Sequence, residues 1–462
     1  MTKKSSHPYI PNSVPEIKEQ MLSEIGLESV EDIFGAIPDH LRFKGKMNIP
    51  GPIMSEYQLR RHVERILARN DNCSRNTSFL GGGCWQHYVP AVCDTIGSRD
   101  EFLTAYVGDT YSDHGKFQAL FESASMIGEL VGMDVVSAPS YDWANALAMA
   151  CRMAVRKTGR REILYCSSLS PERHLVMQNY CKPEIRLIPV EFSLSNGLME
   201  LADLRKKISG NTAAIYLENP TFFGNIEVQA PEIVKIAREA GAEAIVGVDP
   251  SSLGVLEAPG AYGATIVVGD LQPLGLHLQF GGALSGFIAT PDEEEYVAEY
   301  PTVIYGLTTT KVEGEYGFGH VYYERTSYAS REKGKDSIGT TTALHSIIAG
   351  VYLALMGPRG MAELGEGIIQ RLSYAKQAVG NLKGVKLQFQ GANFKEFVLN
   401  FDGSGKSVQE VNEDLKLAGI FGGHDLSRSF PHLGQSALYC ITEVHSQEDI
   451  DHLAAALGKI CA

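Results

Sequence analysis

The sequence predicts an α/β fold with a doubly wound, mainly parallel sheet. Short apolar runs such as TAAIYLE and IVGV alternate with helix-like segments such as APEIVKIAREAGA, which is the βα pattern of a parallel sheet. The run IVGV closes on an acidic residue, Asp249. In such sheets the loops at the carboxyl ends of the strands form the functional site, so we expect the site there.

Composition and charge limit the possible functions. The chain has 462 residues, 44% of them apolar and 21% charged, which is enough for a large core and several domains. A net charge of −14 argues against nucleic acid as a partner. The N-terminus has no apolar run of a secretory signal, and no stretch has the roughly 18 uninterrupted apolar residues of a membrane span. We expect no membrane partner and no metal. The eight cysteines show no CxxC spacing, which favours reduced thiols and a cytoplasmic protein.

Three parts are expected along the chain. Residues 1–70 contain several prolines and two helix-like runs, PEIKEQMLSEIGL and SEYQLRRHVERILARN. They predict an N-terminal arm that packs on the body or on a partner, although a tail folded on its own domain fits equally well. Residues 71–325 predict the large α/β domain. Residues 326–462 predict a C-terminal α+β domain. It contains a long apolar helix from about 342 to 356 and another helix-like segment, followed by strands and helices in the last hundred residues.

Two loops carry candidate functional side chains. The first, SFLGGGCWQHYVP, has three consecutive glycines and contains His87; it is either a structural turn or a loop that faces a site. The second precedes an amphipathic helix and brings together Tyr106, Tyr111 and His114. These side chains could position a carboxylate or move a proton, or they could only cap the helix and satisfy loop hydrogen bonds.

Asp249 suggests a particular cofactor chemistry. In pyridoxal-phosphate (PLP) enzymes of the aspartate-aminotransferase type, such an aspartate pairs with the pyridinium nitrogen, and a later lysine forms the Schiff base. No lysine occurs between Lys235 and Lys311. Asp249 is therefore either a working or relic pyridinium partner, or a residue that caps a strand-loop corner. The helix that follows Tyr141 and Asp142 would direct its N-terminus at a cofactor phosphate in such a fold.

A series of motifs resembles one family nearly end to end. They include SFLGGGCWQHYVPAVCD, FESASMIGELVGMDV, NPTFFGNIE, VDPSSLGVLEAPGAYGATIVVGDLQPLG, FGGALSGFIA and GGHDLSR. Together they resemble subunit 1 (the α subunit) of the two-subunit glycine decarboxylase, the P-protein of the glycine cleavage system. The resemblance implies the PLP type I fold, with a large domain and a C-terminal small domain.

The resemblance also implies how the work is divided between subunits. In that family the α subunit lacks the Schiff-base lysine, and a β subunit holds PLP in an α2β2 heterotetramer. Glycine is decarboxylated there, and the aminomethyl group passes to the lipoyl arm of the H-protein. The lysine motif of the β subunit is similar to LHKTF, and this chain reads Leu276, His277, Leu278, Gln279 and Phe280 at a comparable place. Leu278 then stands at the lysine position, beside His277, and cannot form an imine.

Two segments depart from the family pattern. Residues 107–115 read VGDTYSDHG where many α subunits have a TPYQPE-like run, and residues 334–341 read GKDSIGTT. These departures leave two alternatives open. One is a paralogous α subunit of a PLP lyase or decarboxylase that acts on a different amino acid, and the other is a catalytically silent scaffold.

Overall fold

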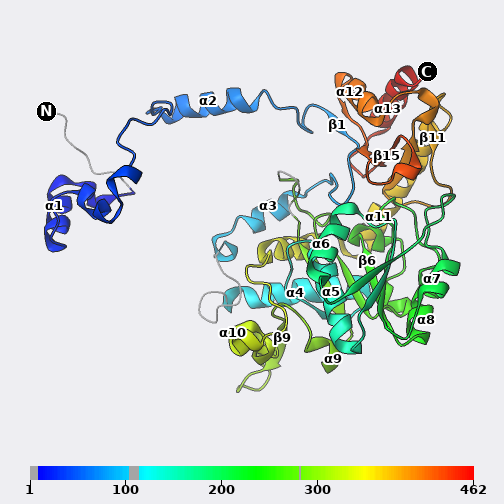
Figure 1. Cartoon of the computed structure of the whole chain (residues 1–462), viewed down its shortest axis with the longest axis horizontal. Coiled ribbons are helices and arrows are strands. Elements are labelled where there is room, and N and C mark those ends of the chain that lie inside the picture. Colours follow the sequence, from blue (N-terminus) through cyan, green and yellow to red (C-terminus); the bar gives the residue numbers. More distant parts are fainter. Residues whose placement is uncertain (1–8, 104–113, 280–281, 283) are drawn as a thin grey trace. The chain divides into compact units, whose positions relative to one another are not determined.

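The computed structural model describes residues 9–103, 114–279, 282 and 284–462. The chain divides into two compact units, Met1–Asn70 and Asp71–Ala462 (Figure 1). The predicted boundary between residues 325 and 326 lies inside the second unit and stays a prediction. That unit nevertheless contains two separate larger sheets, described below.

The N-terminal unit has little core of its own. It contains α1 (Pro15–Glu24), η2 (Val30–Ala36) and α2 (Glu56–Leu67). Among its described apolar residues, Leu22 is the buried one. Four exposed apolar residues of α2 follow helical spacing and lie along one side of the helix: Leu59, Val63, Ile66 and Leu67. Isolated helices of this length are only marginally stable in water. This apolar side of α2 is therefore suited to pack against another surface.

A seven-stranded sheet forms the centre of the second unit. Its strands are β2 (Val135–Val136), β3 (Glu162–Cys166), β4 (Arg186–Val190), β5 (Thr212–Glu218), β6 (Glu243–Val248), β7 (Ile266–Asp270) and β8 (Gly286–Thr290). The order is β2-β8-β7-β6-β5-β3-β4, with parallel pairing from β7 through β4 and antiparallel pairing of β8 with both of its neighbours. The chain reverses its direction of winding between β3 and β5, which makes a topological switch point there.

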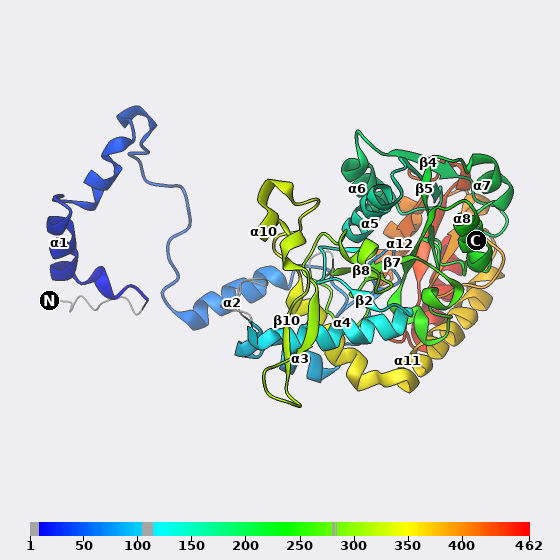
Figure 2. The same cartoon turned by 90° about the horizontal axis from the view of Figure 1, so that it is seen from below.

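Side chains alternate between the two faces of this sheet, as the pleat requires. On β6, Ile245 packs with the core under α5 (Trp143–Thr158), whereas Val246 packs on the opposite face. α6 (Pro171–Cys181) lies beside α5. The opposite face is covered by α4 (Phe117–Val131), α8 (Ala230–Glu239) and α11 (Ala343–Gly380). Figure 2 shows α4 and α11 on the other side of the sheet from α5 and α6.

α11 is kinked at one residue. Gly357 has φ 57° and ψ −178°, and Pro358 follows it, so two helical segments meet at this point. In the described part of the chain, α11 alone is long and apolar enough to cross a membrane. Its residues Leu353, Leu364 and Ile368 are buried in the main core, as expected for the core helix of a folded domain.

A second sheet organises the C-terminal part. Its order is β11 (Lys386–Leu387), β12 (Glu396–Asn400), β15 (Ser436–Cys440) and β14 (His424–Asp425), all antiparallel. α12 (Val408–Leu417) and α13 (Gln447–Ile460) pack on this sheet. β1 (Thr77–Ser78) pairs in parallel with β13 (Ile420–Phe421), so the first strand of the second unit lies beside a strand from the C-terminal part of the chain.

The remaining elements are peripheral to the two larger sheets. They are α3 (Ala91–Gly97), α7 (Leu201–Lys207), α9 (Glu294–Val297), the hairpin β9 (Tyr305–Thr309) and β10 (Tyr316–His320), and α10 (Ser327–Ser330).

Candidate functional site

Asp249 lies at the carboxyl end of β6 and is buried. Its Oδ1 accepts hydrogen bonds from the backbone N–H of Ser251 at 3.0 Å and from the Ser251 hydroxyl at 2.8 Å. Its Oδ2 lies 2.6 Å from the Nζ of Lys395, which precedes β12 of the C-terminal sheet. The side chains of Lys395 and Asp249 are 1% and 7% exposed. The two therefore form a buried ion pair that joins the large sheet to the C-terminal domain.

The space beside Asp249 is almost filled. The Lys395 ammonium lies 4.1 Å from the centre of the Trp85 ring, in a cation–π contact. A cavity of about 10 Å³ remains, lined by Trp85, Trp143, Arg173, Pro220, Thr221, Phe222, Asp249, Phe394 and Glu396. That volume holds about one water molecule.

The N-terminus of α5 is occupied by two carboxylates of the chain itself. Asp142 is the N-cap residue, and its Oδ1 accepts a hydrogen bond from the backbone N–H of Asn145 at 2.6 Å. The backbone N–H of Trp143 donates to Asp270 Oδ2 at 3.0 Å. The backbone N–H groups of Gln272 and Ser285 donate to Oδ1 of the same residue. Burial raises the pKa of Asp270 to about 6, although these three hydrogen bonds oppose the rise.

The triple-glycine loop binds a carboxylate of the C-terminal domain. The backbone N–H of Gly82 lies 2.6 Å from Glu396 Oε1. A Cβ on Gly81 would lie 2.1 Å from the same oxygen, so only glycine permits this approach. Burial raises the pKa of Glu396 to about 7.

His87 follows this loop and is held by Glu443. Its side chain is 1% exposed, and its Nδ1 lies 2.8 Å from Glu443 Oε2. Burial, and next the charge of Lys395, lower the pKa of His87, so the ring is neutral at pH 7 and donates from Nδ1. Glu443 Oε1 also accepts from the backbone N–H of Tyr88 at 2.7 Å. His87 thus lies near the Lys395–Asp249 pair, but its hydrogen bond is to Glu443.

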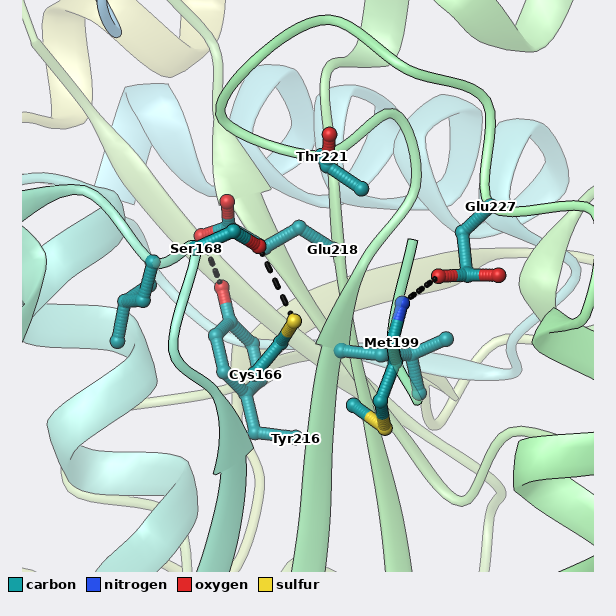
Figure 3. A pocket seen from close by; sticks show the side chains of 9 residues that line it. Cys166, Ser168, Met199, Tyr216, Glu218, Thr221 and Glu227 are labelled. Atoms are coloured by element: carbon teal, nitrogen blue, oxygen red, sulfur yellow. Dashed lines mark hydrogen bonds between the residues drawn. The ribbon is translucent and has the colours of Figure 1, made fainter. Parts of the chain in front are cut away.

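A second small cavity lies at the carboxyl ends of β3 and β5, where the sheet has its switch point. Figure 3 shows Cys166, Ser168, Tyr216, Glu218 and Glu227 around it. Its volume is also about 10 Å³. Burial raises the pKa of Cys166 to about 12, so this thiol stays protonated and unreactive. Glu218 accepts from Tyr216 and pairs with Arg173, which stacks on Trp143.

Three other predicted site residues, Tyr141, His277 and Leu278, do not line the cavity beside Asp249. Tyr141 is exposed. His277 Nε2 pairs with Asp94 Oδ1 at 2.8 Å, with both side chains more than half exposed. Leu278 lies between β7 and β8 and is 42% exposed; it does not line the cavity beside Asp249. Tyr106, Tyr111 and the side chain of His114 lie outside the described residues.

Sequence reasoning missed the residues that fill the site. Lys395 and Glu396 stand in the run FKEFVLNF, where Lys395 directly precedes the buried strand β12 and Glu396 is its first residue. Charged residues at the start of an apolar run indicate that the charges are buried, and a buried charge needs a partner. Asp270 closes the strand TIVVGD in the same way that Asp249 closes IVGV, but no role was assigned to it.

Comparison with solved structures shows the class of fold. A sphingosine-1-phosphate lyase of Burkholderia pseudomallei has a TM-score of 0.66 at 14% identity, covering 92% of this chain and 94% of that one. A NifS-like protein of Rickettsia africae has a TM-score of 0.60 at 12% identity, covering 81% and 96%. With the sheet order and the acidic residue after β6, these neighbours define the chain as a protein of the PLP-dependent type I fold.

Closer relatives show the family. The family model described as glycine cleavage system P-protein matches residues 7–457, so the chain belongs to that family. Proteins named probable glycine dehydrogenase (decarboxylating) subunit 1 are similar over almost the whole length. The protein of Staphylothermus marinus is 40% identical, covering 98% of each chain, and that of Pyrococcus horikoshii is 37% identical, covering 98% of this chain and 99% of the relative. A crystal structure of inhibitor-bound glycine decarboxylase (P-protein) has a TM-score of 0.87 at 31% identity, covering 99% and 100%.

The residues of this chain do not fit PLP. The segment between β7 and β8 has no lysine. The carboxylate of Asp249 is already neutralised by Lys395, and the N–H groups at the start of α5 are bound to Asp142 and Asp270. A space for about one water cannot hold a pyridine ring.

Proposed function

We propose that this chain is the subunit without a Schiff-base lysine in a two-subunit, PLP-dependent glycine decarboxylase of the glycine cleavage system. The observation that carries the proposal is the closed cleft at Asp249, in a chain with no lysine between Lys235 and Lys311. Relatives that match nearly end to end are named as subunit 1 of the decarboxylating glycine dehydrogenase, which supports the same assignment.

In this proposal the partner subunit holds PLP and bears the lysine. Glycine loses its carboxyl group there as CO2, and the aminomethyl group passes to the lipoyl arm of the H-protein. This chain contributes the walls of the shared site and an interface. Tyr106, Tyr111 and His114 are the residues we propose to reach that site, because they lie close together in the sequence and carry donors suited to a carboxylate or a proton.

The N-terminal unit supports the need for a partner. The side of α2 formed by Leu59, Val63, Ile66 and Leu67 is 42–55% exposed. Burying such side chains stabilises an interface by about 25 cal/mol for each Å² of apolar surface. We propose that this side of α2 packs on the partner subunit in an α2β2 heterotetramer.

The cytoplasm is the proposed location. All eight cysteines lie in the described part of the chain and are unpaired. Cys151 and Cys181 are buried free thiols. Reduced thiols persist in a reducing compartment.

Co-expression with the partner subunit tests the proposal. The complex is expected to co-purify, to absorb visible light as a PLP imine and to change its spectrum when glycine is added. This chain purified alone is expected to show no such absorbance. A complex whose spectrum responds to another amino acid but not to glycine would contradict the assigned substrate.

A further inference from the structure

Lys395 is held in its place by an unusual backbone conformation. Its φ is +62°, in the left-handed region that residues with a Cβ rarely adopt. Neighbouring contacts hold this conformation: the backbone N–H of Ile441 donates to Lys395 O at 2.8 Å, and that of Phe394 donates to Gly224 O at 2.9 Å. Such strain persists only where the surrounding structure fixes it, and here it directs a lysine side chain into the cleft.

The Lys395 ammonium lies where a cofactor ring would carry its positive charge. In the type I fold, the aspartate after this strand pairs with a protonated ring nitrogen. Here Asp249 Oδ2 pairs with Lys395 Nζ at 2.6 Å, and the Trp85 ring covers the ammonium. The lysine therefore supplies both the charge and the aliphatic bulk that fill this end of the cleft.

The opposite charge is supplied at the start of α5. Asp270 and Asp142 accept N–H groups from the first turn of this 16-residue helix, where a phosphate would bind in the type I fold. A phosphate there would have to displace these carboxylates or lie against their negative charge. At both ends of the cleft a charged side chain of the chain itself thus stands where a charged group of the cofactor would lie.

We propose that Lys395 and Asp270 are built-in replacements for the cofactor, which turn the former cofactor cleft into a closed structural core. Lys395 takes the place of the protonated ring and Asp270 that of the phosphate. Because both come from this chain, the cleft keeps its charge balance without any ligand. This proposal concerns the fold of this chain and does not depend on the proposed function.

Lys395 does not serve as a displaced Schiff-base lysine in this arrangement. Its Nζ lies on Asp249, which would hold the ring nitrogen, whereas the aldehyde carbon of PLP is attached to the opposite side of the ring. An imine at Lys395 would require the ammonium to leave Asp249 and the ring to be reversed.

Chemical rescue of Lys395→Ala in the full-length chain tests the replacement. The substitution removes three carbons and the nitrogen, which is the composition of n-propylammonium. We expect the variant to melt several degrees lower than the wild type, and n-propylammonium to raise its melting temperature. n-Propanol, which has the same shape without the charge, is the control for the ligand. Lys395→Ala/Asp249→Asn, which lacks the acceptor, is the control for the site; neither control is expected to show the rescue.

A second pair of variants keeps the test decisive if Lys395→Ala does not fold. Lys395→Met leaves the buried Asp249 without its cationic partner, and Lys395→Met/Asp249→Asn removes both charges; we expect the double variant to melt higher than the single one. Wild-type chain is also mixed with pyridoxamine phosphate, which has the ring and phosphate but cannot form an imine with surface lysines. Stoichiometric binding of this compound, equal rescue by n-propanol, or a double variant no more stable than Lys395→Met would overturn the proposal.

Discussion

Asp270 Oδ2 lies 3.0 Å from the backbone nitrogen of Trp143, the first residue of α5. The acid closes β7 and the amide opens α5, so this hydrogen bond joins the central sheet to the helix that covers it. A free N–H at a helix start attracts anions, because the helix dipole is positive there. In this chain the anion is a side chain already in place.

Replacing Asp270 should lower the free energy of unfolding, because the contact between β7 and α5 is lost. Asp270→Ala leaves the backbone N–H groups of Trp143, Gln272 and Ser285 without their acceptor, and each buried unsatisfied donor costs about 1–3 kcal/mol. Asp270→Asn keeps one acceptor oxygen and should be destabilised less. Urea unfolding at pH 7 measures the difference. Equal stability of Asp270→Ala and wild type would show that water replaces the carboxylate without loss.

Glu396 should give the protein a defined pH dependence. Its folded pKa of about 7 lies above the ordinary value of 4.5, because burial favours the protonated acid. The stability it contributes is therefore fully present below pH 4.5 and is lost as the pH rises to about 7. Glu396→Gln should be more stable than the wild type above pH 7, by an amount on the order of 2 kcal/mol, and this advantage should vanish near pH 4.

Melting temperatures of the wild type and of Glu396→Gln, recorded from pH 4 to pH 8, measure this difference in stability. The exposed Glu366→Gln is the matched control, and its profile should follow that of the wild type. An advantage of Glu396→Gln that grew towards low pH would contradict the sign of the shift.

His87 should stabilise the fold without taking part in the reaction. Its ring is 1% exposed and bound to Glu443, so His87→Phe removes a buried hydrogen bond and should cost about 1–3 kcal/mol. In the complex with the partner subunit, His87→Phe should leave KM for glycine unchanged, and kcat per folded molecule should equal that of the wild type. A fall in kcat at unchanged stability would instead place His87 in the reaction.

Unlike His87, the residues Tyr111 and His114 before α4 should affect the kinetics. Tyr111→Phe and His114→Asn should lower kcat/KM by tenfold or more if these groups position the substrate or move a proton. Tyr180→Phe on α6 is the control, because it is the same change on a different surface. Unchanged kinetics in both loop variants would remove this loop from the shared site.

The apolar side of α2 should bind the partner subunit. Val63→Asp places a charge among Leu59, Ile66 and Leu67. The protein concentration at which the two subunits co-elute on size-exclusion chromatography should then rise at least tenfold. Gln58→Asp adds the same charge outside that apolar side and should leave the complex intact. Both variants should melt as the wild-type chain does, since α2 carries no buried residue.

Local patterns were sufficient to predict the central sheet. The runs around Ile215, Val246 and Val267 alternate with helix-like segments, and the structure confirms a mainly parallel α/β fold. The predicted break between two helices after Met356 corresponds to the kink at Gly357, where glycine followed by proline permits a sharp change of direction.

The filled site could not be predicted from local pattern. Lys395 is 146 residues from Asp249 in the sequence, and no periodicity connects a residue before β12 with the end of β6. The absence of a lysine after β7 pointed to a lost cofactor anchor. It did not show that another lysine had taken the place beside Asp249, because burial and pairing between two sheets depend on how those sheets pack.

We propose that this chain acts only beside a subunit that holds PLP. Release of labelled CO2 from carboxyl-labelled glycine measures that activity. The assay compares the complex, this chain alone and the partner alone, each with added PLP and the lipoyl H-protein. We predict CO2 release by the complex and none by this chain alone. Release of CO2 by this chain alone, at a rate comparable to that of the complex, would contradict the account.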